Sequence, residues 1–146
     1  MMITNERQLK ITRAQVMRFE KTLLDLDTRK DATSTLPPLL RQAEREALAS
    51  QLATLRAEIA EYELLRSGNQ RVFDAASFAE LPQILIKARI AQGLTQRDLA
   101  ERLGLKEQQI QRYEGTGYAS ASLQRVQQVI EALRVQVSER ISLKGR

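Results

Sequence analysis

Four polar side chains in the second half of the chain have the types and the spacing to hydrogen-bond the edges of nucleic-acid bases. Glutamine pairs bidentately with adenine, arginine pairs with guanine, and glutamate accepts from the amino group of cytosine. On a helix these side chains lie on the face opposite Ile110 and Tyr113. The residues are Glu107, Gln108, Gln111 and Arg112. A polar face that water simply solvates is the alternative interpretation.

The chain contains neither cysteine nor histidine. Their absence removes thiol nucleophiles, disulfides, zinc-finger ligands, Ser-His-Asp triads and the usual general base near neutral pH. The carboxylates and lysines are dispersed over helical faces, with no Gly-rich phosphate loop or metal-ligand cluster beside them. We therefore expect no enzyme, no bound metal and no cofactor.

The charge of the chain is unevenly distributed. Its 146 residues carry 23 Lys and Arg against 18 Asp and Glu, a net charge of +5. Residues 71–146 hold 12 basic against 8 acidic residues, whereas residues 1–70 hold 11 against 10. This asymmetry favours a polyanionic partner for the second half, although excess charge is more often a solvated face. The six aromatic residues are too few for a platform that stacks single strands, so double-stranded DNA is the better ligand.

Nothing in the sequence suggests a membrane protein. No uncharged apolar run approaches the roughly 18 to 20 residues that a bilayer span needs. The first ten residues, MMITNERQLK, have charges where a signal peptide would need an apolar stretch. We therefore expect a folded, soluble and cytoplasmic protein without a membrane partner.

Residues 4–30 have the periodicity of an amphipathic helix. Apolar residues recur seven positions apart: Leu9, Val16 and Leu23. Thr4 or Asn5 can cap this helix by accepting hydrogen bonds from the backbone N–H groups of its first turn. The period breaks before two consecutive prolines, so we expect a turn near residues 30–36.

Residues 39–65 show the seam of a coiled coil, with apolar residues at alternating spacings of four and three. These residues are Leu48, Leu52, Leu55, Ile59 and Tyr62. The two segments predict an antiparallel helical hairpin over residues 1–68, followed by a connector over residues 69–80. An isolated hairpin leaves much apolar surface exposed, so this one serves either dimerisation or the binding of a different protein. The sequence leaves both open.

From residue 81 the pattern changes to short helices separated by small breaks. Gly93 ends the first, and Thr95 followed by Asp98 resembles a capping box at the start of the second. Gly104 permits a tight turn between the second and the third. We therefore expect an all-α protein in which a small bundle over residues 81–134 follows the hairpin.

Residues 95–114, TQRDLAERLGLKEQQIQRYE, resemble the XRE family, the Cro/CI-type helix-turn-helix domains of phage repressors and many bacterial regulators. The residues that carry the resemblance stand in register: Gln96, Ala100, Gly104, Ile110 and Glu114. The resemblance covers about residues 82–134 and implies a repressor-like helix-turn-helix bundle.

The resemblance also implies how the domain binds DNA. A third helix, beginning near Lys106, enters the major groove and presents the four polar side chains to base edges. Gln96, assisted by Thr95 and Arg97, contacts phosphates from the N-terminus of the preceding helix. Hydroxyls of the following loop supply further phosphate contacts: Thr116, Tyr118, Ser120 and Ser122. Lys106 stands where the family usually has a Ser or Thr cap, so it exchanges that cap for a phosphate contact. Tyr118 could equally pack inside the domain.

Residues 135–146 alternate apolar and polar positions as on a short strand. The apolar positions are Val135, Val137, Ile141 and Leu143. A single strand must pair with a second copy or with another protein, unless the segment is the frayed end of a helix. Either this tail or the hairpin could form the homodimer that regulators of this family need to read half-sites about 34 Å apart.

Together these inferences predict a sequence-specific, double-stranded-DNA-binding transcriptional regulator, acting as a repressor. A small DNA-binding domain with an extra helical arm also resembles the antitoxin of a toxin–antitoxin pair, whose DNA domain represses the operon while the other segment binds the toxin. The alternative is a protein-interaction scaffold that uses the hairpin and does not bind DNA. Residue types alone do not give the operator, the regulated genes or an effector ligand.

Overall fold

The computed structural model describes residues 2–28 and 37–145, so the turn expected near residues 30–36 lies outside the described residues. The chain divides into two compact units, Met1–Leu65 and Arg66–Arg146. Both units are helical, and the two described ranges contain no strand. The predicted all-α class is therefore confirmed. No helix in this part of the chain is long and apolar enough to cross a membrane.

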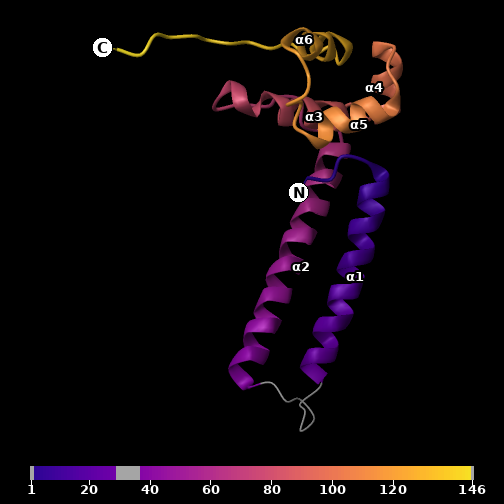
Figure 1. Cartoon of the computed structure of the whole chain (residues 1–146), viewed down its shortest axis with the longest axis vertical. Coiled ribbons are helices and arrows are strands. Elements are labelled where there is room, and N and C mark those ends of the chain that lie inside the picture. Colours follow the sequence, from indigo (N-terminus) through magenta and orange to yellow (C-terminus); the bar gives the residue numbers. More distant parts are fainter. Residues whose placement is uncertain (1, 29–36, 146) are drawn as a thin grey trace. The chain divides into compact units, whose positions relative to one another are not determined.

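The first unit is a pair of antiparallel helices, α1 over Glu6–Thr28 and α2 over Pro38–Arg66 (Figure 1). Asn5 caps α1, because its Oδ1 accepts a hydrogen bond from the backbone N–H of Gln8 at 2.8 Å. The Gln8 side chain accepts in turn from the backbone N–H of Thr4 at 2.8 Å. The first turn of α1 is thus closed by local polar side chains, one of which the sequence predicted as a cap.

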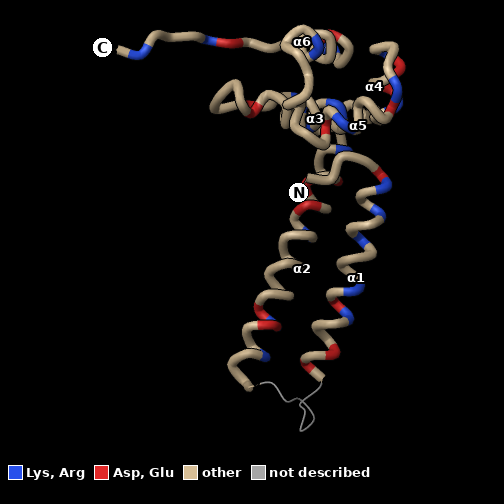
Figure 2. Tube along the Cα trace, viewed as in Figure 1, with Lys and Arg blue, Asp and Glu red and all other residues tan. Residues whose placement is uncertain are grey.

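Ion pairs between the two helices follow the register of the hairpin. They join Arg13 to Glu63, Glu20 to Arg56 at 2.6 Å and Asp27 to Arg45 at 2.9 Å. Residue numbers rise along α1 as those of the partners fall along α2, as antiparallel helices require. Charges of both signs are spread along the hairpin (Figure 2). Because these side chains are well exposed, each pair contributes about 1 kcal/mol at most.

The apolar seam of the hairpin is only partly buried. Leu9 and Leu52 are each 4% exposed. Other seam residues are half-buried: Val16, Phe19, Leu23, Leu26, Leu48, Leu55 and Ile59. Two helices can cover only one side of each other, so part of this apolar surface stays in contact with water.

The second unit is a bundle of short helices. They are α3 (Leu81–Ala91), α4 (Gln96–Leu103), α5 (Glu107–Gly115) and α6 (Leu123–Ala132), with a preceding 3-10 turn η1 (Phe78–Glu80). α4 packs against both α5 and α6. The largest fully buried side chains are Leu85, Ile86, Leu99, Ile110, Val129 and Leu133. Because α3, α4, α5 and α6 each contribute at least one of them, these helices share one core.

The turn between α4 and α5 is built on Gly104. This residue ends α4 with a left-handed φ of 67°, which residues with a Cβ rarely adopt. The backbone N–H of Leu105 then donates to the carbonyl oxygen of Ala100 at 2.9 Å. The predicted glycine turn between these two helices is confirmed.

The tail does not form the short strand suggested by its alternating pattern. α6 ends at Ala132, Arg134 takes a left-handed φ of 54°, and the described residues beyond it are irregular. Ile141 and Leu143 are 89% and 96% exposed. A strand needs a neighbouring strand to satisfy its backbone, and the described part of a single chain offers none.

Candidate nucleic-acid interface

The outer face of α5 carries the polar side chains that the sequence singled out. Ile110 is fully buried and Tyr113 is 8% exposed, so these two residues fix the face of α5 that packs inward. Gln109 is half-buried and donates from its Nε2 to the Tyr113 hydroxyl at 3.2 Å. The exposed residues of the outer face are Glu107, Gln108, Gln111 and Arg112. Because they follow the spacing i, i+1, i+4 and i+5, their side chains project side by side.

Lys106 stands immediately before α5. Its backbone is extended, its side chain is exposed, and it makes no capping hydrogen bond. The start of this helix is therefore less well capped than that of α4, as predicted. An exposed ammonium group beside the N-terminal N–H groups of a helix favours an anion at this position.

A capping box closes the start of α4, as predicted. The Thr95 hydroxyl oxygen accepts from the backbone N–H of Asp98 at 3.0 Å, and Asp98 Oδ2 accepts from the backbone N–H of Thr95 at 2.8 Å. The hydrogen bonds that the Asp98 carboxyl accepts from the backbone and the side chain of Thr95, with the nearby charges of Arg102 and Arg97, lower its pKa. Arg97 is exposed, and its Nε lies 3.3 Å from the Glu101 carboxylate.

Gln96, expected to contact phosphate, is turned into the protein. Its side chain is 4% exposed, and its Nε2 donates to Glu114 Oε1 at 2.9 Å. The first residue of α4 thus ties the start of that helix to the end of α5. The sequence placed Gln96 at the correct end of α4 but did not give the direction of its side chain.

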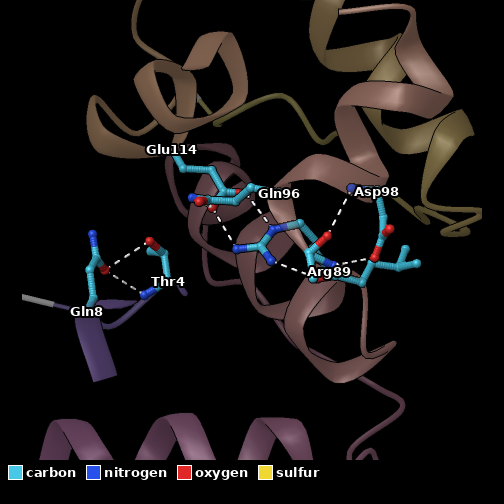
Figure 3. A network of polar contacts seen from close by, with 8 residues as sticks. Thr4, Gln8, Arg89, Gln96, Asp98 and Glu114 are labelled. Carbon is cyan, nitrogen blue, oxygen red and sulfur yellow. Dashed lines mark hydrogen bonds and ion pairs between the residues drawn. The ribbon is translucent and has the colours of Figure 1, made fainter. Parts of the chain in front are cut away.

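A buried ion pair between Arg89 of α3 and Glu114 of α5 is the centre of this polar network (Figure 3). Arg89 Nε and Nη2 each donate to one carboxylate oxygen of Glu114 at 2.7 Å. The third nitrogen, Nη1, donates to the carbonyl oxygen of Leu94 at 2.8 Å. The side chains of the pair are 3% and 1% exposed, so the network is shielded from water. The three guanidinium nitrogens and both carboxylate oxygens nevertheless have hydrogen-bond partners. It joins α3, the α3–α4 turn, α4 and the last turn of α5.

The loop after α5 holds the remaining residues predicted to contact phosphate. The Thr116 hydroxyl donates to the carbonyl oxygen of Arg112 at 3.0 Å, within the last turn of α5. Ser122 caps α6, because its Oγ accepts from the backbone N–H of Arg125 at 3.0 Å. Thr116, Ser120 and Ser122 are all exposed, so their hydroxyls border the outer surface of the loop.

Tyr118 differs from its neighbours in this loop. Its side chain is 4% exposed, and its ring stacks on that of Tyr113 with centroids 5.8 Å apart. Burial raises the pKa of its phenol, and the negative charge of Glu114 adds to the effect. The hydroxyl oxygen is buried without a hydrogen-bond partner among the described residues. Of the two interpretations of Tyr118, the structure therefore favours packing.

Comparison with known families gives a match inside the second unit. Residues 85–140 match the family model described as Helix-turn-helix. This segment is a helix-turn-helix domain. The match confirms the resemblance to the XRE type and gives the chain a DNA-binding domain of transcriptional regulators. No curated protein and no solved structure matches the chain.

The helix-turn-helix domain brings most of the predicted contact residues to its surface. The predicted base-reading residues share the outer face of α5, while Thr95, Arg97 and Lys106 flank the starts of α4 and α5. Gln96 and Tyr118 are buried instead. No cluster of His, Cys, Asp or Glu that could hold a metal ion occurs in the described ranges.

Sequence reasoning missed Arg89. A signal was present but weak: Arg89 stands at helical spacing from Leu85 and Ile86 and directly before Ile90, but Lys87 in the same stretch makes a second basic residue there look ordinary. Its partner Glu114, however, is 25 residues away and on another helix. Glu114 was recognised only as a residue shared with the family.

Proposed function

We propose that the chain is a sequence-specific, double-stranded-DNA-binding transcriptional repressor, and that α5 of its helix-turn-helix domain reads base edges in the major groove. The observation that carries the proposal is the outer face of α5. Two amides, one guanidinium and one carboxylate project from it together, while Ile110 on the opposite face is fully buried. These groups match the donors and acceptors that distinguish base pairs in the major groove.

Phosphate contacts come, in this proposal, from groups around the base-reading face. The side chains are those of Thr95, Arg97, Lys106, Thr116, Ser120 and Ser122, all exposed. Gln96 contributes through its backbone N–H in the first turn of α4, since its side chain is bound to Glu114. Tyr118 contributes by holding the loop against Tyr113. A protein placed in this way blocks transcription by occupying its site, which is the simplest mode of repression.

The proposal is tested by titrating the purified protein with its own upstream region and with a scrambled duplex of equal length at two salt concentrations. Specific binding at least about a hundredfold tighter than non-specific binding is expected. Equal affinities that collapse in salt would mean that only the electrostatic attraction of the backbone is present. No binding to either duplex would favour the scaffold alternative.

A matched pair of variants shows whether α5 is the reading element. Gln108→Ala is expected to lower specific affinity by about 1–3 kcal/mol, because one base contact is lost. Gln127→Ala removes the same group from an exposed position of α6 and is expected to leave affinity unchanged. Equal effects of the two substitutions would contradict base reading by α5.

A second candidate function is that of an autoregulating antitoxin. The observation that favours it is the half-buried seam of the hairpin, which could accept a toxin as partner. Expression of the toxin, encoded by the adjacent gene, is expected to arrest growth, and co-expression of this chain is expected to restore it. If expression of the adjacent gene leaves growth unaffected, the antitoxin function is contradicted, and the DNA-binding proposal is unchanged.

A further inference from the structure

One flank of the hairpin is closed by ion pairs. Their α1 members, Arg13, Glu20 and Asp27, are seven residues apart and therefore lie along one edge of that helix. Their partners lie on the facing edge of α2. We call this edge of the hairpin, defined by the three ion pairs, the charged flank.

The middle of α2 has a different character. Residues 47–55, ALASQLATL, include no charged residue, the longest such run in any described helix. On either side of this run α2 is densely charged (Figure 2). The exposed members of the run that share one side of α2, at spacings of three and four residues, are Ala47, Ser50, Gln51 and Thr54. A helix face that only met water would be expected to continue the charged pattern of its neighbours.

A groove opens along this run on the edge away from the charged flank. It has a volume of about 330 Å³ and is lined by Gln15, Phe19, Ser50, Gln51, Thr54 and Leu55. Phe19 and Leu55 are half-buried, so apolar atoms of the seam are reachable from the groove. We call this edge, defined by the groove residues, the neutral flank.

We propose that the neutral flank is the surface on which a second copy of this chain packs, with residues 47–55 of the two copies facing each other across a two-fold axis. A nucleic acid or a charged peptide would find no counter-charge on this run. An equally neutral surface is available on the other copy, because a two-fold interface brings the same patch together from both sides.

Side-chain size supports the same arrangement. Alanine, serine and threonine at the exposed positions let two helices approach closely, and interaxial distance depends on the side chains at the contact. The two hairpins would then form a four-helix bundle that covers Phe19 and Leu55 of both copies. This inference goes beyond the proposed function, because it concerns the hairpin alone and is tested without DNA.

Because the chain contains no cysteine, a single introduced cysteine reports the interface directly. Ser50→Cys, treated with a short bifunctional maleimide, is expected to give a covalent dimer. Ala60→Cys is the matched control, since Ala60 lies four residues after Arg56 and three before Glu63 on the charged flank. This control variant is expected to give no covalent dimer under the same treatment. Equal cross-linking of both variants, or of neither, would overturn the proposal.

Sedimentation of the full chain supplies an independent readout. The unmodified chain is expected to be a dimer, and Ser50→Glu is expected to weaken dimerisation at least about tenfold, because the axis brings two new carboxylates together. Ala60→Glu is expected to leave dimerisation unchanged, and circular dichroism checks that both variants remain helical. A chain that is monomeric throughout would assign the flank to a different protein. A dimer that Ser50→Glu leaves intact would place the interface elsewhere, for example at the tail.

Discussion

Two buried polar side chains of the helix-turn-helix domain differ in whether they have hydrogen-bond partners. Glu114 accepts hydrogen bonds from both Arg89 and Gln96, whereas the hydroxyl of Tyr118 has no partner among the described residues. A buried polar group without a partner costs about 1–3 kcal/mol, while a satisfied one is close to neutral. Substitutions at these positions are therefore expected to act in opposite directions.

Tyr118→Phe is expected to raise the free energy of unfolding by about 1 kcal/mol, because it removes the unpaired hydroxyl and keeps the ring on Tyr113. Urea denaturation measures this change. Operator affinity is expected to stay the same, since the side chain is buried. A clear loss of affinity without loss of stability would restore the phosphate contact that the family resemblance implies for this hydroxyl.

Glu114→Gln is expected to destabilise the domain by about 3–5 kcal/mol, because it leaves the guanidinium of Arg89 buried without its counter-charge. Glu107→Gln makes the same chemical change at an exposed position of the same helix and is expected to shift stability by less than about 0.5 kcal/mol. Chemical denaturation of both variants measures the two changes in the free energy of unfolding. Similar stabilities would show that the ion pair is not what holds α5 to α3.

At the scale of the elements, helix ends were predictable wherever local chemistry sets them. Thr95 with Asp98 and Gly104 are close in sequence to the turns that they close, so the bounds of α4 followed from residue types. The directions of Gln96 and Arg89 did not, because each depends on Glu114, which reaches them only in the folded bundle. The tail, whose pattern suggested a strand, is irregular in the single chain for a related reason, since strands are completed by partners and helices by themselves.

The α4 capping box gives a pH-dependent prediction. Thr95→Ala is expected to lower the free energy of unfolding by about 1 kcal/mol at neutral pH, because the backbone N–H of Asp98 loses its acceptor. The pKa of Asp98 is lowered by folding, so the stability from its carboxylate is present above the ordinary pKa of 3.8 and is lost as pH falls through the folded value. Thermal unfolding of the wild type and of Asp98→Ala should therefore differ at pH 7 and converge in acid. A difference that is constant with pH would contradict this role.

For the molecule as a whole, the division of charge matches the division of structure. The first unit is nearly balanced in charge and pairs several of its charges across the hairpin, whereas the second unit holds the basic excess and the helix-turn-helix domain. The sequence showed this asymmetry before any fold was known. It could not show which hairpin flank is open, because that depends on which edge of α2 faces α1.

The salt dependence of DNA affinity reports how many copies of the chain bind the DNA, so it tests DNA binding by the second unit together with dimerisation through the first. The logarithm of DNA affinity falls with the logarithm of salt concentration in proportion to the phosphates neutralised. Lys106→Ala is expected to weaken binding to all duplexes alike and to reduce the slope by about 1 for each copy on the DNA. If a dimer joined through the hairpins binds, the slope is expected to fall by about 2, whereas a single bound copy would lower it by about 1. Lys21→Ala removes an exposed lysine from α1 and is expected to leave the slope unchanged. If both lysines change the slope equally, the hairpin also lies on the DNA, and the assignment of binding to the second unit is wrong.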